Sequence, residues 1–133
     1  MKRIFVFVLA LSLLLVGCTR RNCDVGREQI VEAYEAAGYN VSTGVYEQPL
    51  EYGQTAYIQA NHPDGEYIYF TFFETEADAK AYKREFYHPV MMVLFSVIFG
   101  EPSWQRWEVY GCIVVEYDNS DYMQPFEKLL KGF

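Results

Sequence analysis

The sequence predicts an α+β domain with helices on one face of an antiparallel sheet. Two segments alternate apolar and polar residues on either side of a turn, and three others repeat apolar residues at helical spacing. Their order along the chain is helix, hairpin, helix, hairpin, helix. Twelve Tyr among 133 residues and an aromatic content of 18% are typical of a folded chain. We therefore expect a two-layer domain.

The first helix is expected over residues 24–38. Asp24 is suited to cap its start, because its side chain can accept from the free N–H groups of the first turn. Ile30 and Tyr34 are four residues apart and share one face. Gly38 accepts the left-handed conformation that commonly ends a helix.

Alternation over residues 55–60 and 67–73 predicts an antiparallel hairpin. Residues 62–65, His-Pro-Asp-Gly, form its turn, in which Pro presets one backbone angle and Gly accepts a positive φ. The preceding residues 41–47 are compatible with a further strand. The alternation places Phe70 on the core face of the hairpin.

The second helix is expected to start at Thr75, with Asp78 completing a variant of the capping box. Its inner stripe comprises Ala79, Tyr82 and Phe86 and continues through Val90, Val93 and Val97. Pro89 interrupts this stripe, so we expect a kink or a break near His88.

Residues 89–99 are almost entirely apolar, with Ser96 as the only polar side chain. The segment is too short to span a bilayer. We expect it to form a buried helix, with Met92, Phe95 and Phe99 partly exposed because they lie off the stripe. The alternative is an exposed patch that contacts a partner or a membrane, for which adaptable methionines are suited.

A second hairpin is expected from residues 105–110 and 112–117, with its turn at Gly111. A single strand with Gly111 at a bulge is the alternative. The last helix is expected within residues 121–131, where Pro125 suits the first turn.

The amino terminus has the pattern of an export signal. Lys2 and Arg3 precede residues 4–16, which are apolar except for Ser12 and are too short to span a bilayer. The end of this run, Leu15-Val16-Gly17-Cys18, resembles the lipobox of bacterial lipoproteins. The resemblance implies cleavage before Cys18, a thioether-linked diacylglycerol on its sulfur, and acylation of the new amino terminus.

The chain is therefore divided into a signal peptide (1–17), a lipidated tether (18–23) and one α+β domain (24–133). Such acylation would anchor the domain in the lipid bilayer, on the extracytoplasmic side. The whole-chain pattern is also similar to that of small lipoproteins of Gram-positive gut bacteria. That similarity is one of general pattern and implies no activity.

The charge of the chain argues against nucleic-acid binding. The formal net charge is −7, becomes −9 when Lys2 and Arg3 leave with the signal, and is −11 over residues 22–133. Such a domain repels polyanions and has no basic stripe along its sequence. Arg20 and Arg21, directly after the anchor, are either solvated or close to anionic headgroups.

Two cysteines remain after lipidation of Cys18. Cys23 and Cys112 are either joined in a disulfide or free, with Cys112 then a small buried hydrophobe on a strand. We expect the free form, because two cysteines make no framework.

No catalytic motif, metal site or cofactor site is expected. The sequence contains no GxSxG, no phosphate-binding glycine loop, no HExxH and no paired CxxC. His62 with Asp64 and Glu66 is interpreted as a polar turn, not a metal cluster. Cys112 in an apolar strand is expected to be inert as a nucleophile.

A tyrosine-rich strand face is the best candidate for a binding surface. Alternation predicts that five side chains point the same way, opposite the core: Tyr57, Gln59, Tyr67, Tyr69 and Thr71. Tyrosine combines a flat apolar ring with a polar tip, which suits a sugar, a peptide or a protein interface. Ordinary cross-strand packing, or coverage by residues 89–99, is the alternative.

The leading expectation is a membrane-anchored, non-enzymatic binding module that uses Tyr57, Gln59, Tyr67 and Tyr69, with Met92 and Phe95 as a second candidate contact. Its partner is an unidentified envelope protein, peptide or glycan. One alternative is an envelope enzyme that acts on cell-wall or carbohydrate substrates. The other is a structural subunit that docks on a membrane protein through residues 89–99.

Overall fold

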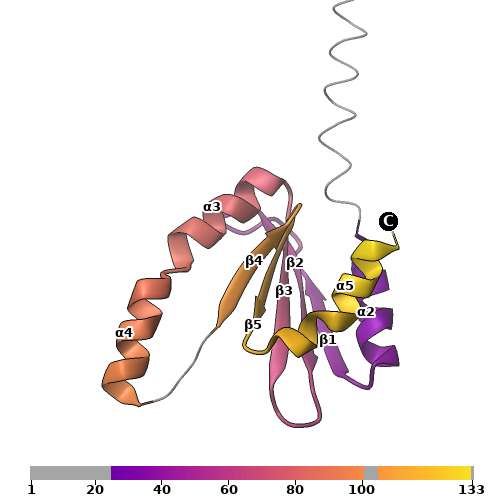
Figure 1. The fold of residues 1–133 in the computed structure, drawn as a ribbon. Coiled ribbons are helices and arrows are strands. Elements are labelled where there is room, and N and C mark those ends of the chain that lie inside the picture. Colours follow the sequence, from indigo (N-terminus) through magenta and orange to yellow (C-terminus); the bar gives the residue numbers. More distant parts are fainter. Residues whose placement is uncertain (1–24, 101–104, 133) are drawn as a thin grey trace, which may run out of the picture.

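The computed structural model describes residues 25–100 and 105–132 (Figure 1). The predicted signal peptide, the tether, Cys18 and Cys23 lie outside these residues, as does Asp24. The α+β fold class is confirmed, because helices accompany a five-stranded antiparallel sheet.

The strands lie in the order β1-β2-β3-β5-β4, and each neighbouring pair is antiparallel. Their bounds are β1 Asn40–Val45, β2 Gln54–Asn61, β3 Tyr67–Phe73, β4 Arg106–Tyr110 and β5 Ile113–Tyr117. Both hairpins form where the alternation predicts them, and β1 adds a third strand to the first. The pairing of β3 with β5 joins the two hairpins into one sheet.

The helices cover both faces of the sheet, so the expectation that all of them lie on one face is wrong. The helical bounds are α2 Arg27–Ala36, α3 Glu76–Phe86, α4 Pro89–Phe99, η2 Ser120–Met123 and α5 Gln124–Lys131. Helices α2 and α5 pack on one face, while α3 packs on the other (Figure 1). We call these the core face and the second face.

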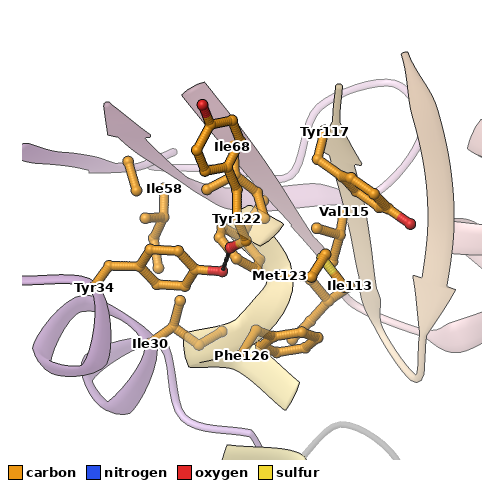
Figure 2. Close-up of a cluster of buried hydrophobic side chains, with 12 residues drawn as sticks. Ile30, Tyr34, Ile58, Ile68, Ile113, Val115, Tyr117, Tyr122, Met123 and Phe126 are labelled. Carbon is orange, nitrogen blue, oxygen red and sulfur yellow. Dashed lines mark hydrogen bonds between the residues drawn. The ribbon is translucent and has the colours of Figure 1, made fainter. Parts of the chain in front are cut away.

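The core face carries the main apolar cluster. Ile58, Phe70 and Val115 come from three adjacent strands and are fully buried against α2, η2 and α5. Tyr34 of α2 is also fully buried, and its hydroxyl donates to the backbone carbonyl of Tyr122 at 2.6 Å (Figure 2). This hydrogen bond satisfies the one polar atom that α2 places inside the cluster.

Local sequence explains where the helices begin and end. The Thr75 side chain accepts from the Asp78 backbone N–H at 3.1 Å, as the capping pattern predicts. Helix α3 ends at Phe86, and α4 begins at Pro89, which confirms the break expected near His88. Proline disfavours a helical residue before it, and the backbone of His88 is non-helical (φ −118°, ψ 85°).

Helix α4 does not fill the core, contrary to expectation. None of its residues is buried, and the predicted stripe residues Val90, Val93 and Val97 are 72%, 40% and 76% exposed. The break at His88 turns the chain, so the stripe of α3 does not continue onto the sheet. In Figure 1, α4 extends from the end of α3 away from the sheet.

Cys112 is buried and disulfide-bonded, so the free thiol that we expected is wrong. The other two cysteines of the sequence, Cys18 and Cys23, lie outside the described residues. Cys112 directly precedes β5, and its carbonyl accepts from the Phe73 backbone N–H at 2.8 Å. The disulfide is thus attached next to β5, at a residue whose backbone is hydrogen-bonded to the end of β3.

Replacing Phe70 by Ala should cost about 3–5 kcal/mol of unfolding free energy, because it empties a fully buried aromatic site. Tyr69→Ala on the same strand should cost clearly less, since Tyr69 is only half-buried on the second face. Urea titration of both variants measures the difference. Equal losses would contradict the assignment of the two residues to faces of unequal burial.

Candidate binding face

The second face of the sheet presents the predicted tyrosine-rich surface. Tyr57 pairs with Thr71, Gln59 with Tyr69, and Asn61 with Tyr67, so these residues share one face of β2 and β3. Tyr57, Gln59, Tyr67 and Tyr69 are half-buried, whereas Thr71 is buried.

Helix α3 covers only one end of this face. Ala79 is fully buried against Phe73 and Val114, and Tyr82 packs beside them. This small cluster lies at the end of β3 where Thr71 and Phe73 emerge. Asn61 and Tyr67 lie at the other end of the face. Tyr57, opposite Thr71, and Tyr69, between the two ends, remain partly exposed to solvent.

Aromatic rings extend across the face in two groups. The first group comes from β2, β3 and the residue after β1: the rings of Tyr57 and Tyr69 are 5.8 Å apart and nearly parallel (6°), and Tyr46 lies 6.1 Å from Tyr57. The second group joins α3 to β4, where Tyr82 stacks on Trp107 at 5.7 Å and 15°. These separations are within the range of favourable aromatic pairs.

A glycine permits the first group to form. Gly44 on β1 is directly opposite Tyr57, and a Cβ at this position would lie 2.5 Å from the Tyr57 ring. The ring therefore lies over the backbone of β1, which only a residue without a side chain allows.

Glu116 lies between the two aromatic groups. It pairs with Tyr69 on one side and with Trp107 on the other, so all three are neighbours on the second face. Burial raises the pKa of the Glu116 carboxyl, and the nearby Asp118 raises it further. Burial also raises the pKa of Tyr69 to about 12, so its hydroxyl remains a hydrogen-bond donor at neutral pH. We call Tyr46, Tyr57, Tyr69, Tyr82, Trp107 and Glu116 the aromatic face.

Trp107 contributes an unsatisfied donor to the aromatic face. Its indole Nε1 is buried and has no hydrogen-bond partner within the part of the chain that the structure describes. A buried donor without an acceptor carries a free-energy cost.

The sequence analysis missed Tyr46, Tyr82, Trp107 and Glu116 as members of this surface. Alternation within residues 105–117 does place Trp107 opposite the core, which is a detectable signal. The proximity of Trp107 and Glu116 to Tyr69, however, depends on the pairing of β3 with β5, which no local pattern reveals. Met92 and Phe95 lie on α4 and are not part of the aromatic face.

The other candidate cluster is structural. His62 Nδ1 is 2.8 Å from Asp64 Oδ1 in the turn between β2 and β3. The Tyr122 hydroxyl donates to Asp64 Oδ2 at 2.7 Å, and this bond is the main cause that lowers the pKa of Asp64. Within residues 25–100 and 105–132, no three His, Cys, Asp or Glu side chains are grouped as metal ligands. The turn is thus fastened to η2 by a hydrogen bond.

Comparison with known proteins finds no similar protein. No family model matches the chain, and neither a curated protein nor a solved structure matches it. Among the described helices, none combines the length and apolar character needed to cross a membrane.

Glu116→Gln should raise the unfolding free energy at pH 7. Because burial raises the pKa of Glu116 in the folded state, the neutral form favours folding, and stability is lost as pH rises through that pKa. The gain should disappear at about pH 3, where the carboxyl is protonated in both states. Urea titrations at both pH values test this, with Glu127→Gln on the exposed side of α5 as control. A gain of equal size at both pH values would show a packing effect instead.

Proposed function

We propose that the protein is a lipid-anchored, extracytoplasmic binding module that holds a neutral or cationic glycan on the aromatic face. The observation that carries this proposal is the row of half-exposed rings on both sides of Glu116. One face of a pyranose ring presents C–H groups, which pack on aromatic rings. Its hydroxyls find acceptors and donors in Glu116, Gln59 and the tyrosine hydroxyls.

Charge supports a ligand that is not anionic. Residues 22–133 carry a net charge of −11, and Glu116 lies within the aromatic face itself. A polyanionic ligand would be repelled, whereas hydroxyls and ammonium groups are compatible with a carboxylate. An enzyme that uses two carboxyl groups would hold both of them in a site that excludes water. Asp118, the second carboxyl with a raised pKa near Glu116, is exposed to solvent, and the aromatic rings are half-exposed. These features favour a binder over an enzyme.

The cysteines support the extracytoplasmic location. Disulfides persist mainly in oxidising compartments, and Cys112 is disulfide-bonded. A thioether on Cys18 would consume the thiol of that residue, which leaves Cys23 to pair with Cys112. This combination requires both export and the lipobox chemistry.

Binding is tested by calorimetric titration of the protein with N-acetylglucosamine oligosaccharides as a neutral probe. Trp107→Ala and Tyr69→Ala should each weaken binding by about tenfold or more, as expected for the loss of an aromatic contact at the centre of a site. Phe95→Ala on α4 is the matched control, because it also removes an exposed ring but lies outside the aromatic face. Unchanged affinity in the Trp107 and Tyr69 variants, or loss only in the Phe95 variant, would contradict the proposal.

Anchoring is tested separately. Cys18→Ala should abolish incorporation of labelled fatty acid and release the protein from the membrane fraction, since the lipobox chemistry requires that thiol. Cys23→Ala is the control and should keep its lipid. A Cys18→Ala protein that still incorporates fatty acid would contradict the lipoprotein assignment.

A further inference from the structure

Helix α4 is an apolar element that the rest of the domain leaves uncovered. Eight of its apolar side chains are 40–76% exposed: Val90, Met91, Val93, Leu94, Phe95, Val97, Ile98 and Phe99. No Asp, Glu, Lys or Arg occurs between Pro89 and Gly100. Exposed apolar surface of this extent on a monomer marks a contact with something else.

The distribution of these side chains identifies the occupant. At 100° per residue, the exposed positions cover about 240° of the helix circumference. The remaining side of the helix, which carries Met92 and Ser96, is less exposed. A groove in a partner protein, or a second copy of α4, would bury one side and leave the remainder in water. A hydrocarbon medium satisfies the whole circumference at once.

Several polar groups of α4 are satisfied within the helix. The Ser96 hydroxyl donates to the Val93 carbonyl at 2.8 Å, and the Gly100 N–H donates to the Ser96 carbonyl at 3.0 Å. Pro89 at the first turn has no N–H to leave unpaired. A helix of 11 residues is about 16 Å long, so it can lie in the interfacial region of one leaflet, where water and headgroups reach the backbone groups of its two ends.

Two basic side chains lie close to the start of α4. Lys83 and Arg84 are in the last turn of α3 and are followed by Glu85. Lys80, one turn earlier, is ion-paired with Glu76. Basic side chains beside an apolar helix are the combination that binds an anionic lipid surface.

Aromatic residues lie at the base of α4. Tyr87 stacks on Trp107 with ring centroids 5.9 Å apart, and the Lys83 ammonium lies 5.5 Å from the centre of the Tyr87 ring. Tyrosine, tryptophan and basic side chains are enriched where apolar helices meet the headgroup region.

We propose that α4 inserts into an anionic lipid bilayer as a membrane contact separate from the anchor at Cys18. The helix then lies in the interfacial region of one leaflet, with Tyr87, Lys83 and Arg84 at the headgroup level. This contact is independent of what the aromatic face binds. It orients the domain on the membrane, whereas a tether alone leaves the domain free to rotate.

Photo-crosslinking of the full chain in intact cells tests this proposal. A benzophenone amino acid replaces Phe95, and the phospholipids carry a radiolabelled phosphate. The diacylglycerol expected on Cys18 has no phosphate, so the anchor itself adds no label. Val45 is the matched control position, because it is 63% exposed but lies on β1, at the opposite edge of the sheet from β4. We expect labelled protein from position 95 and at least a tenfold weaker signal from position 45.

Other outcomes overturn the proposal. A crosslink from position 95 to a second copy of the chain would assign α4 to self-association. A crosslink to a different protein would assign it to a docking subunit. Absence of any adduct, or equal lipid labelling at both positions, would show that α4 has no specific membrane contact.

The basic residues provide a second measurement in the same background. Lys83→Gln with Arg84→Gln should lower the lipid-adduct yield from position 95, by up to about fivefold for each charge removed near an anionic surface. Lys128→Gln on α5 is the control and should have no effect. An unchanged yield in the double variant would contradict the part of the proposal that assigns these cations to the lipid surface.

Discussion

The Tyr34 hydroxyl donates to the Tyr122 carbonyl inside the apolar cluster of the core face, and the remaining structure depends on the packing that this bond completes. Tyr34 belongs to the first described helix, and Tyr122 to the segment that leads into the last one. Their contact brings α2 and α5 together over Ile58, Phe70 and Val115. The centre of this face of the sheet is thereby covered, which removes Ile58, Phe70 and Val115 from any role in binding.

Among the described helices, only α3 packs on the second face. Because α3 ends at Phe86 and Pro89 starts a new helix, the chain leaves the sheet before it reaches Tyr57 and Tyr69. The same proline therefore has two consequences. It leaves a row of aromatic side chains partly exposed on the sheet, and it produces a separate apolar helix away from it. Both candidate surfaces follow from a single break in the chain.

The two surfaces differ in physical character. The aromatic face combines rings with a carboxylate of raised pKa, so it offers a ligand both a stacking surface and a hydrogen-bonding group. Helix α4 has no charged side chain. Such a surface discriminates only between water and an apolar medium, which is why a glycan suits the first and a bilayer the second.

Alternation and turn chemistry in the sequence were sufficient to predict both hairpins, the shared face of Tyr57, Gln59, Tyr67 and Tyr69, the cap at Thr75 and the break at His88. These features are local, because side-chain direction in a strand and the missing N–H of proline act within a few residues. Only the tertiary structure decided that β3 pairs with β5, which brings Glu116 and Trp107 beside Tyr69. It also decided that Val90, Val93 and Val97 remain outside the core, because burial depends on where the chain goes after the proline and not on how apolar the segment is.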